Sequence, residues 1–188
     1  MNRILCSTAA IAALLSACAP TPPPPPIVVP VPVVTAPAIT QVGMDCVIRA
    51  GAMDMYEIEA ARLALQMSTN ANVRAFAQQM INDHTNATAQ MAAAMQSLGM
   101  NPPPPTLTVD QTARLNNLRT AGTGFDAMYL ADQVSAHQEA LALHQYCAAN
   151  AGGPVGSVSA GLSPHIQGHL TQAQTLQAGW RGTAGERG

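Results

Sequence analysis

The chain has 188 residues, a formal net charge of −2 and only 10% charged side chains. A charge so close to zero excludes the basic surface with which proteins bind phosphate backbones, so no nucleic-acid partner is expected. Aromatic residues make up 3% of the chain, whereas alanine and methionine are abundant, which favours closely packed helices over sheets.

Residues 1–17 have the pattern of a secretory signal peptide. Arg3 precedes an apolar run from Ile4 to Leu15, which is shorter than the ~20 residues of a membrane-spanning helix. The run ends in Leu-Ser-Ala-Cys, which resembles a bacterial lipobox and predicts that Cys18 becomes an acylated first residue. This predicts a lipoprotein that contacts the membrane through its lipid, on the periplasmic face of the outer membrane. The alternative is an ordinary cleaved signal with an incidental cysteine, and hence a periplasmic or secreted protein.

Residues 18–42 are rich in proline and include an unbroken run from Pro22 to Pro26. Such a segment extends ~3.1 Å per residue and offers few backbone donors to a core. It is interpreted either as a semi-rigid tether that holds the folded part away from a membrane, or as a disordered leader with no spacing role. The folded domain is expected at residues 43–180, followed by a flexible, glycine-rich tail at 181–188.

The domain is expected to contain four long helices and one short one. The recurrence of apolar residues every three to four positions predicts the first three long helices at 44–68, 71–98 and 125–149, and the short helix at 109–120. For the last helix, Ser163-Pro164 is the strongest start signal, and the helix continues to 178. Residues 155–162 are interpreted as a preceding turn of the same helix, kinked at the proline.

The connection at residues 99–124 determines the topology. It contains the helix-breaking run from Pro102 to Pro105 and a capping-box pattern from Thr108 to Gln111. Its extended and helical parts together reach over ~50 Å, more than the ~42 Å length of a 28-residue helix. Crossing the bundle would make the second and third long helices parallel. We therefore predict an all-α, ferritin-like four-helix bundle with a crossover connection containing a short extra helix.

Cys46 and Cys147 are the cysteines that remain after the signal and the acylation site. In the crossover topology both lie at the same end of the bundle. In an up-down-up-down bundle they would lie at opposite ends, beyond the ~7 Å limit for bridging. Because disulfides persist in exported proteins, we predict a Cys46–Cys147 disulfide.

Several strings follow one known pattern: Glu57-Ile-Glu59, Val73 to Ala77, Met80 to Thr85, Phe125-Asp126 with Tyr129, His137, and Pro164 followed by His169-Leu170. Together they resemble the ferritin-like bacterial family called domain of unknown function 4142, over about residues 44–177. The resemblance implies an exported helical bundle, often a lipoprotein or a secreted protein. It implies no established activity.

The five histidines all fall in predicted helices, and most fall near mid-height. His84 occupies the apolar face of its helix, and His137 and Glu57 lie at a similar height on neighbouring helices. Imidazole and carboxylate groups suit Zn, Cu or Fe. We therefore predict a transition-metal site formed by Glu57, His84, His137, and His165 or His169. Hydrogen bonds from Asp83 or Asp126 would orient these ligands.

Other interpretations of this polar centre remain open. Buried histidines and carboxylates also form hydrogen-bonded clusters that fix helix register. Met80 lies four residues before His84, a pairing that suits Cu(I), although helical methionines commonly fill cores.

The Glu-x-x-His pairs of ferritin-like di-iron sites are missing from the sequence, which argues against ferroxidase chemistry. The preferred function is a non-enzymatic binding or structural role in the bacterial envelope. The alternative is a divergent metal-dependent oxidase or peroxide-handling enzyme of the periplasm.

Overall fold

The computed structural model describes residues 38–185, with side chains described up to residue 180. The expected signal peptide, the expected acylation site Cys18 and most of the expected tether lie outside the described residues. The described part contains five α-helices and a short 3₁₀ helix, η1. In chain order these are α1 (Gln41–Met67), α2 (Ala71–Ser97), α3 (Val109–Arg119), η1 (Gly122–Gly124), α4 (Phe125–Asn150) and α5 (Gly153–Gly185). Among them is no helix with the length and apolar content needed to cross a membrane.

The helix ends follow from local side-chain chemistry. Thr40 caps α1 by accepting from the backbone N–H of Gly43, and Asn70 caps α2 in the same way. Thr108 and Gln111 form the expected reciprocal capping box at the start of α3. Gly99, with a φ of 72°, ends α2 in the left-handed conformation that glycine adopts without strain. The short loop between α1 and α2 and the packing of the two helices against each other confirm the expected hairpin.

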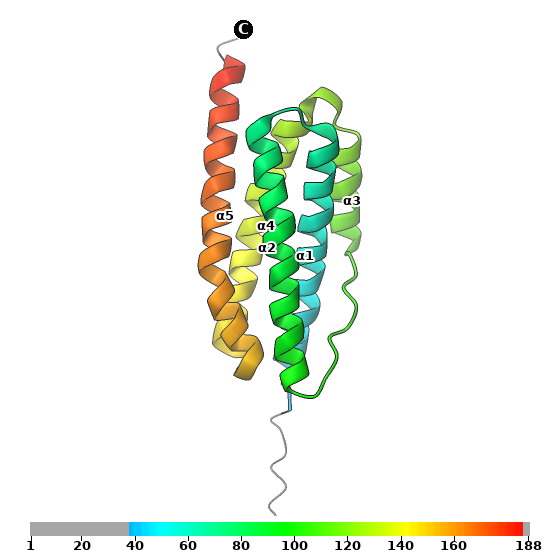
Figure 1. Cartoon of the computed structure of the whole chain (residues 1–188), viewed down its shortest axis with the longest axis vertical. Helices are drawn as coiled ribbons and strands as arrows, with labels where there is room; N and C mark the ends of the chain where they lie inside the picture. The colour runs from blue at the N-terminus through cyan, green and yellow to red at the C-terminus, as the bar shows by residue number, and fades with distance from the viewer. Residues whose placement is uncertain (1–37, 186–188) are drawn as a thin grey trace, which may run out of the picture. The chain divides into compact units, whose positions relative to one another are not determined.

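Helices α1, α2, α4 and α5 form a bundle in which α1 packs against α2 and α4, and α5 also packs against α2 and α4. Figure 1 shows that α1 and α5 run in one direction while α2 and α4 run in the other. The segment between α2 and α4 returns along the length of the bundle, and its helix α3 packs against α1 and α4. The predicted crossover bundle, with α2 parallel to α4, is confirmed.

Small side chains let the helices approach closely. Ala60, Ala61, Ala64 and Ala77 have no exposed surface, and they pack in one core cluster. Larger apolar groups fill the rest of this cluster, including Tyr56, Phe76, Met80, Leu115 and Tyr129. The abundant alanine of the sequence therefore serves close helix contacts in this cluster, which lies at the end of the bundle where α1 ends and α2 begins.

The disulfide between Cys46 and Cys147 is present, with the two Cα atoms 5.9 Å apart. Both cysteines are buried in a second core cluster together with Val47, Met95 and Leu143. The disulfide joins the start of α1 to the end of α4. This is the arrangement that the crossover topology predicts, because both positions lie at the same end of the bundle.

Helix α1 begins at Gln41, three residues earlier than expected and within the expected tether, and the last helix also differs from expectation. Helix α5 begins at Gly153, so residues 155–162 belong to the same helix as expected, and Pro164 lies inside it and does not start it. Gly152 and Gly153 both have positive φ and reverse the chain within a very short loop. Buried residues on both sides of the proline, Val155 and Leu170 among them, hold the helix continuous despite the lost backbone donor. The helix also continues to Gly185, beyond the boundary expected after Trp180.

We expect removal of the disulfide to lower the free energy of unfolding by about 2–5 kcal/mol, because the bond closes a long loop in the unfolded chain. The sequence separation of the two cysteines is 101 residues. Urea unfolding of a Cys46→Ala, Cys147→Ala double variant measures the effect. Reductant should destabilise the wild type and leave the double variant unchanged. An identical urea midpoint for oxidised and reduced wild type would contradict the prediction.

Candidate metal centre

Three histidines from three helices meet inside the bundle. His84 comes from α2, His137 from α4 and His169 from α5, and all are buried. Their ring centroids form a nearly equilateral triangle with sides of 5.5, 5.6 and 5.9 Å. One ring nitrogen from each lies within 4.8 Å of the other two. Ligand nitrogens of a tetrahedral zinc ion are about 3.3 Å apart, so closing the triangle around a metal requires shifts of about 1.5 Å at most.

Each of these rings is anchored through one nitrogen. Nδ1 of His84 lies 2.8 Å from Oδ1 of Asp54, and Nε2 of His169 lies 2.9 Å from Oδ2 of Asp83. Nδ1 of His137 lies 2.9 Å from the backbone carbonyl oxygen of Gln133. Carboxylate and carbonyl oxygens accept hydrogen bonds, so the anchored nitrogen carries the proton in every ring.

The other nitrogen of each ring has no partner. Nε2 of His84, Nε2 of His137 and Nδ1 of His169 are all buried without a hydrogen bond. Because the anchored nitrogens are protonated, a neutral ring presents a lone pair on each of these free atoms. Metal-binding histidines almost always donate their second N–H to a carboxylate or a carbonyl. The three rings have this arrangement.

The electrostatic surroundings favour neutral rings at two of the three positions. Burial lowers the pKa of His137 to about 4, with a further contribution from the nearby His84. Burial also lowers the pKa of His169 to about 4, together with the charge of His137. Burial opposes the charged form of His84 too, but the hydrogen bond to Asp54 and the charge of Glu57 offset it, so the pKa of His84 is raised. A metal ion at this centre would displace the proton of His84.

A buried carboxylate stands behind His137. Glu57 accepts a hydrogen bond from Nε2 of Gln133 at 2.6 Å, and its Oε1 lies 3.7 Å from Nδ1 of His137. Burial raises the pKa of Glu57 to about 7, against the opposing charge of His84. Glu57 therefore lies beside Nδ1 of His137, the anchored nitrogen, and not beside its unpartnered Nε2.

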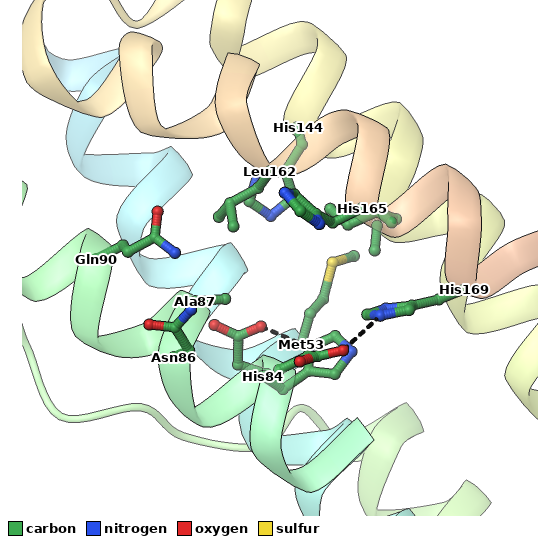
Figure 2. A pocket seen from close by; sticks show the side chains of 13 residues that line it. Met53, His84, Asn86, Ala87, Gln90, His144, Leu162, His165 and His169 are labelled. Carbon is green, nitrogen blue, oxygen red and sulfur yellow. Dashed lines mark hydrogen bonds and ion pairs between the residues drawn. The ribbon is translucent and has the colours of Figure 1, made fainter. Parts of the chain in front are cut away.

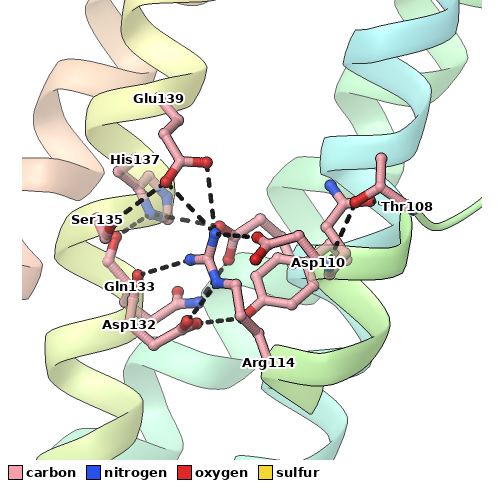
Figure 3. A network of polar contacts seen from close by, with 11 residues as sticks. Thr108, Asp110, Arg114, Asp132, Gln133, Ser135, His137 and Glu139 are labelled. Atoms are coloured by element: carbon pink, nitrogen blue, oxygen red, sulfur yellow. Dashed lines mark hydrogen bonds and ion pairs between the residues drawn. The ribbon is translucent and has the colours of Figure 1, made fainter. Parts of the chain in front are cut away.

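A polar network around Arg114 ties the crossover helix to this region (Figure 3). Arg114 of α3 pairs with Asp132 of α4 at 2.8 Å and lies over the ring of Tyr56 on α1. The hydroxyl of Tyr56 donates to the same Asp132. Asp132 and Gln133 are neighbours, so the network holds the turn of α4 that contains the carbonyl anchor of His137.

A pocket of about 130 Å³ adjoins the centre. His84 and His169 line it, and Figure 2 shows His144 and His165 on its opposite side. His144 is buried and its Nδ1 has no partner, whereas His165 is exposed. Apolar walls come from Ala87, Ala140, Leu162 and Ile166.

The structure brings together three of the predicted ligands: His84, His137 and His169. Of the two α5 histidines that the sequence left open, His169 joins the cluster and His165 lies outside it, at the exposed side of the pocket. Glu57 stands behind His137 and outside this group of metal-capable atoms. Of the two carboxylates proposed to orient the ligands, Asp83 accepts a hydrogen bond from His169. Asp126 lies in the first turn of α4, about 16 Å along the helix from His137, and its buried Oδ1 has no partner.

Sequence reasoning missed the residues that anchor the other two rings. Asp54 accepts from His84, and its second oxygen accepts from the hydroxyl of Thr88 at 3.0 Å. A signal for Asp54 was present, since it lies three residues before Glu57 on the inward face of α1. The anchor of His137 is a backbone carbonyl, which no side-chain pattern reveals.

The chain matches one family model and two solved structures. The sequence model of the family described as "Domain of unknown function (DUF4142)" matches residues 30–176. No curated protein sequence gives a significant match.

Two solved structures share the fold. A DUF305 fragment from Deinococcus radiodurans is 17% identical, with a TM-score of 0.67 over 76% of this chain and 99% of that one. A structure titled "CopM in the Cu(I)-bound form" is 16% identical, with a TM-score of 0.63 over 75% of this chain and 99% of that one. At these identities the likeness concerns the fold.

We expect the metal-free protein to become less stable as the pH rises, because Glu57 is protonated in the folded state and loses this proton at higher pH. Its pKa is about 7 in the fold and 4.5 in the unfolded chain, so between these values the folded state holds a proton that the unfolded state releases. Glu57→Gln removes this proton and keeps an acceptor for Gln133. From pH 5 to pH 8, the free energy of unfolding of the wild type should fall by about 2–3 kcal/mol relative to the variant.

Urea unfolding in the presence of chelator, at both pH values, measures this difference. His137 and His169 titrate in both proteins, whereas His84, whose pKa the charge of Glu57 raises, contributes to the difference together with Glu57. Parallel pH profiles for wild type and Glu57→Gln would show that Glu57 ionises normally in the fold.

Proposed function

The chain belongs to the DUF4142 family, and we propose that it binds a transition-metal ion through His84, His137 and His169. One observation carries the proposal: three buried imidazoles from three different helices each have one anchored and one unpartnered nitrogen, and one ring nitrogen of each lies within 4.8 Å of the others. Converging lone pairs with anchored second nitrogens are what a metal ion requires of histidine ligands.

A purely structural role for the same residues fits this geometry poorly. Buried polar groups that only fix helix register satisfy one another by hydrogen bonding. Here three rings that lie close together each keep one nitrogen without a hydrogen bond, and each buried nitrogen that lacks a partner costs about 1–3 kcal/mol. A metal ion would offset all three costs with one interaction at the same point.

The donor set limits the choice of metal. Neutral imidazoles suit Zn, Cu, Fe and Ni, and they are poor ligands for Mg or Ca. Three histidines leave a tetrahedral ion with one further position. The neighbour of similar fold is titled as binding Cu(I), so copper joins zinc as the first ion to test. The absence of Glu-x-x-His from the sequence separates the proposed site from the carboxylate-bridged di-iron centres of ferritin-like proteins.

We further propose that the protein is exported and anchored by a lipid on Cys18, so that its metal chemistry takes place in the bacterial envelope. This rests on the signal pattern before Cys18 and on the proline-rich segment after it. The disulfide is consistent with an oxidising compartment.

We expect His169→Ala to lower the affinity for Zn(II) or Cu(I) by at least about 100-fold, beyond the 10–100-fold typical for loss of an outer hydrogen-bond partner. His165→Ala is a matched control, because it removes a histidine one turn earlier on the same helix, outside the cluster. Isothermal titration of both variants measures the affinities. Equal affinity of the two variants would contradict the proposal.

Metal binding should also stabilise the fold. At a free metal concentration of 100 times the dissociation constant, the wild type and His165→Ala should gain about 2.7 kcal/mol in the free energy of unfolding. His169→Ala should gain nothing at the same concentration. A wild type whose melting temperature stays constant on addition of zinc, copper and iron would show that the triangle is structural.

We expect the lipid anchor to depend on Cys18. Expressed in a bacterium, the wild type should partition into detergent and carry a mass consistent with acylation at Cys18. Cys18→Ala should remain in the aqueous phase. Mass spectrometry and detergent partitioning measure both, and an aqueous, unmodified wild type would favour an ordinary secreted or periplasmic protein.

A further inference from the structure

The histidine triangle is closed on one side and open on the other. Phe76 packs against His137 with ring centroids 6.4 Å apart, and Glu57 lies behind the same ring. On the other side, His84 and His169 border the pocket of about 130 Å³, while His137 does not. A fourth coordination position of an ion held by the three rings therefore faces this pocket.

His144, a second histidine of α4, lines the pocket and has no role in the proposed metal site. His144 is 4% exposed, and its Nδ1 is buried without a partner. Figure 2 shows His144 across the pocket from His84. Burial lowers the pKa of His144, so the ring is neutral and free to donate or accept one hydrogen bond inside the pocket.

We propose that the pocket is the binding site of a small ligand, coordinated to the metal at one end and hydrogen-bonded to His144 at the other. This inference rests on the proposed metal site. It assigns to that site an exogenous ligand with a nitrogen or oxygen donor atom, bound at the position that the three histidines leave open.

Size and charge restrict the ligand. An apolar cavity of about 150 Å³ holds a benzene molecule, so a pocket of this volume takes only a few heavy atoms. Asp54 and Asp83 accept hydrogen bonds from two of the metal ligands, also line the pocket, and together balance the two charges of a divalent ion. The ligand is therefore neutral or at most singly charged, and azide is a probe of this size.

We assign no contact with the ligand to three of the other residues that line the pocket. His165 is exposed on its outer side, where water competes for any hydrogen bond. Leu162 forms part of the apolar wall. Met53 also lines the pocket, and its thioether is the one soft protein donor among the lining residues.

Cobalt(II) and azide test the proposal in the full chain. The visible spectrum of Co(II) reports metal binding by the three histidines, and a saturable change on addition of azide reports a ligand at the open position. We expect this change in the wild type. His144→Ala should weaken azide binding about 3–10-fold, as the loss of one buried hydrogen bond does, without changing the affinity for cobalt. His165→Ala should change azide binding less than twofold.

A variant that fills the pocket gives an independent readout. Leu162→Trp should leave the cobalt spectrum in place and abolish the response to azide, with its fold checked by circular dichroism. A cobalt spectrum in the wild type that azide leaves unchanged would overturn the ligand site while the metal site stands. Equal azide affinity of wild type and His144→Ala would also overturn it.

The role of Met53 is decided by the same measurement. A response to azide that appears only in Met53→Leu would assign the fourth position to the thioether and overturn the proposal. A wild type that binds no cobalt, zinc or copper at all would remove the proposed function, and with it the ligand.

Discussion

The centre of this bundle depends on three hydrogen bonds that each hold one nitrogen of a buried imidazole. Asp54, Asp83 and the carbonyl of Gln133 accept these bonds, and they come from three different helices. Each bond orients a ring and holds a proton on the anchored nitrogen, and the second nitrogen of each ring has no partner. Unpartnered polar atoms destabilise a protein interior. The rest of the fold must hold them in place.

The fold meets this requirement with close packing and two long-range connections. Alanine faces bring the helices together around the upper core, and the disulfide joins α1 to α4 at the other end. The crossover helix adds a third constraint, because Arg114 pairs with Asp132 in the turn of α4 that anchors His137. A rigid frame of this kind keeps the rings apart from one another and available to a ligand.

The comparison with ferritin-like proteins separates fold from chemistry. The chain shares a bundle architecture with a DUF305 fragment and with CopM at 16–17% identity, which carries information about the backbone. The proposed metal site is made of imidazoles, with carboxylates only as hydrogen-bond acceptors behind them. Such a site would bind a single borderline or soft ion. Next to it lies a pocket that His144 also lines.

Much of this arrangement could be predicted from the sequence. Apolar periodicity placed His84 inside the bundle, the length of the connection implied the crossover, and the crossover implied the disulfide. These properties depend on spacing along one chain segment, or on which end of the bundle a residue occupies.

The site itself was decided by the tertiary structure. His165 and His169 are one turn apart on nearly the same helix face, so only the position of α5, which begins at Gly153, determines which of them joins His84 and His137. The anchors of His84 and His137 lie on a neighbouring helix and on the backbone. The free nitrogens follow from those contacts, because a ring presents its lone pair only after the fold has fixed its proton.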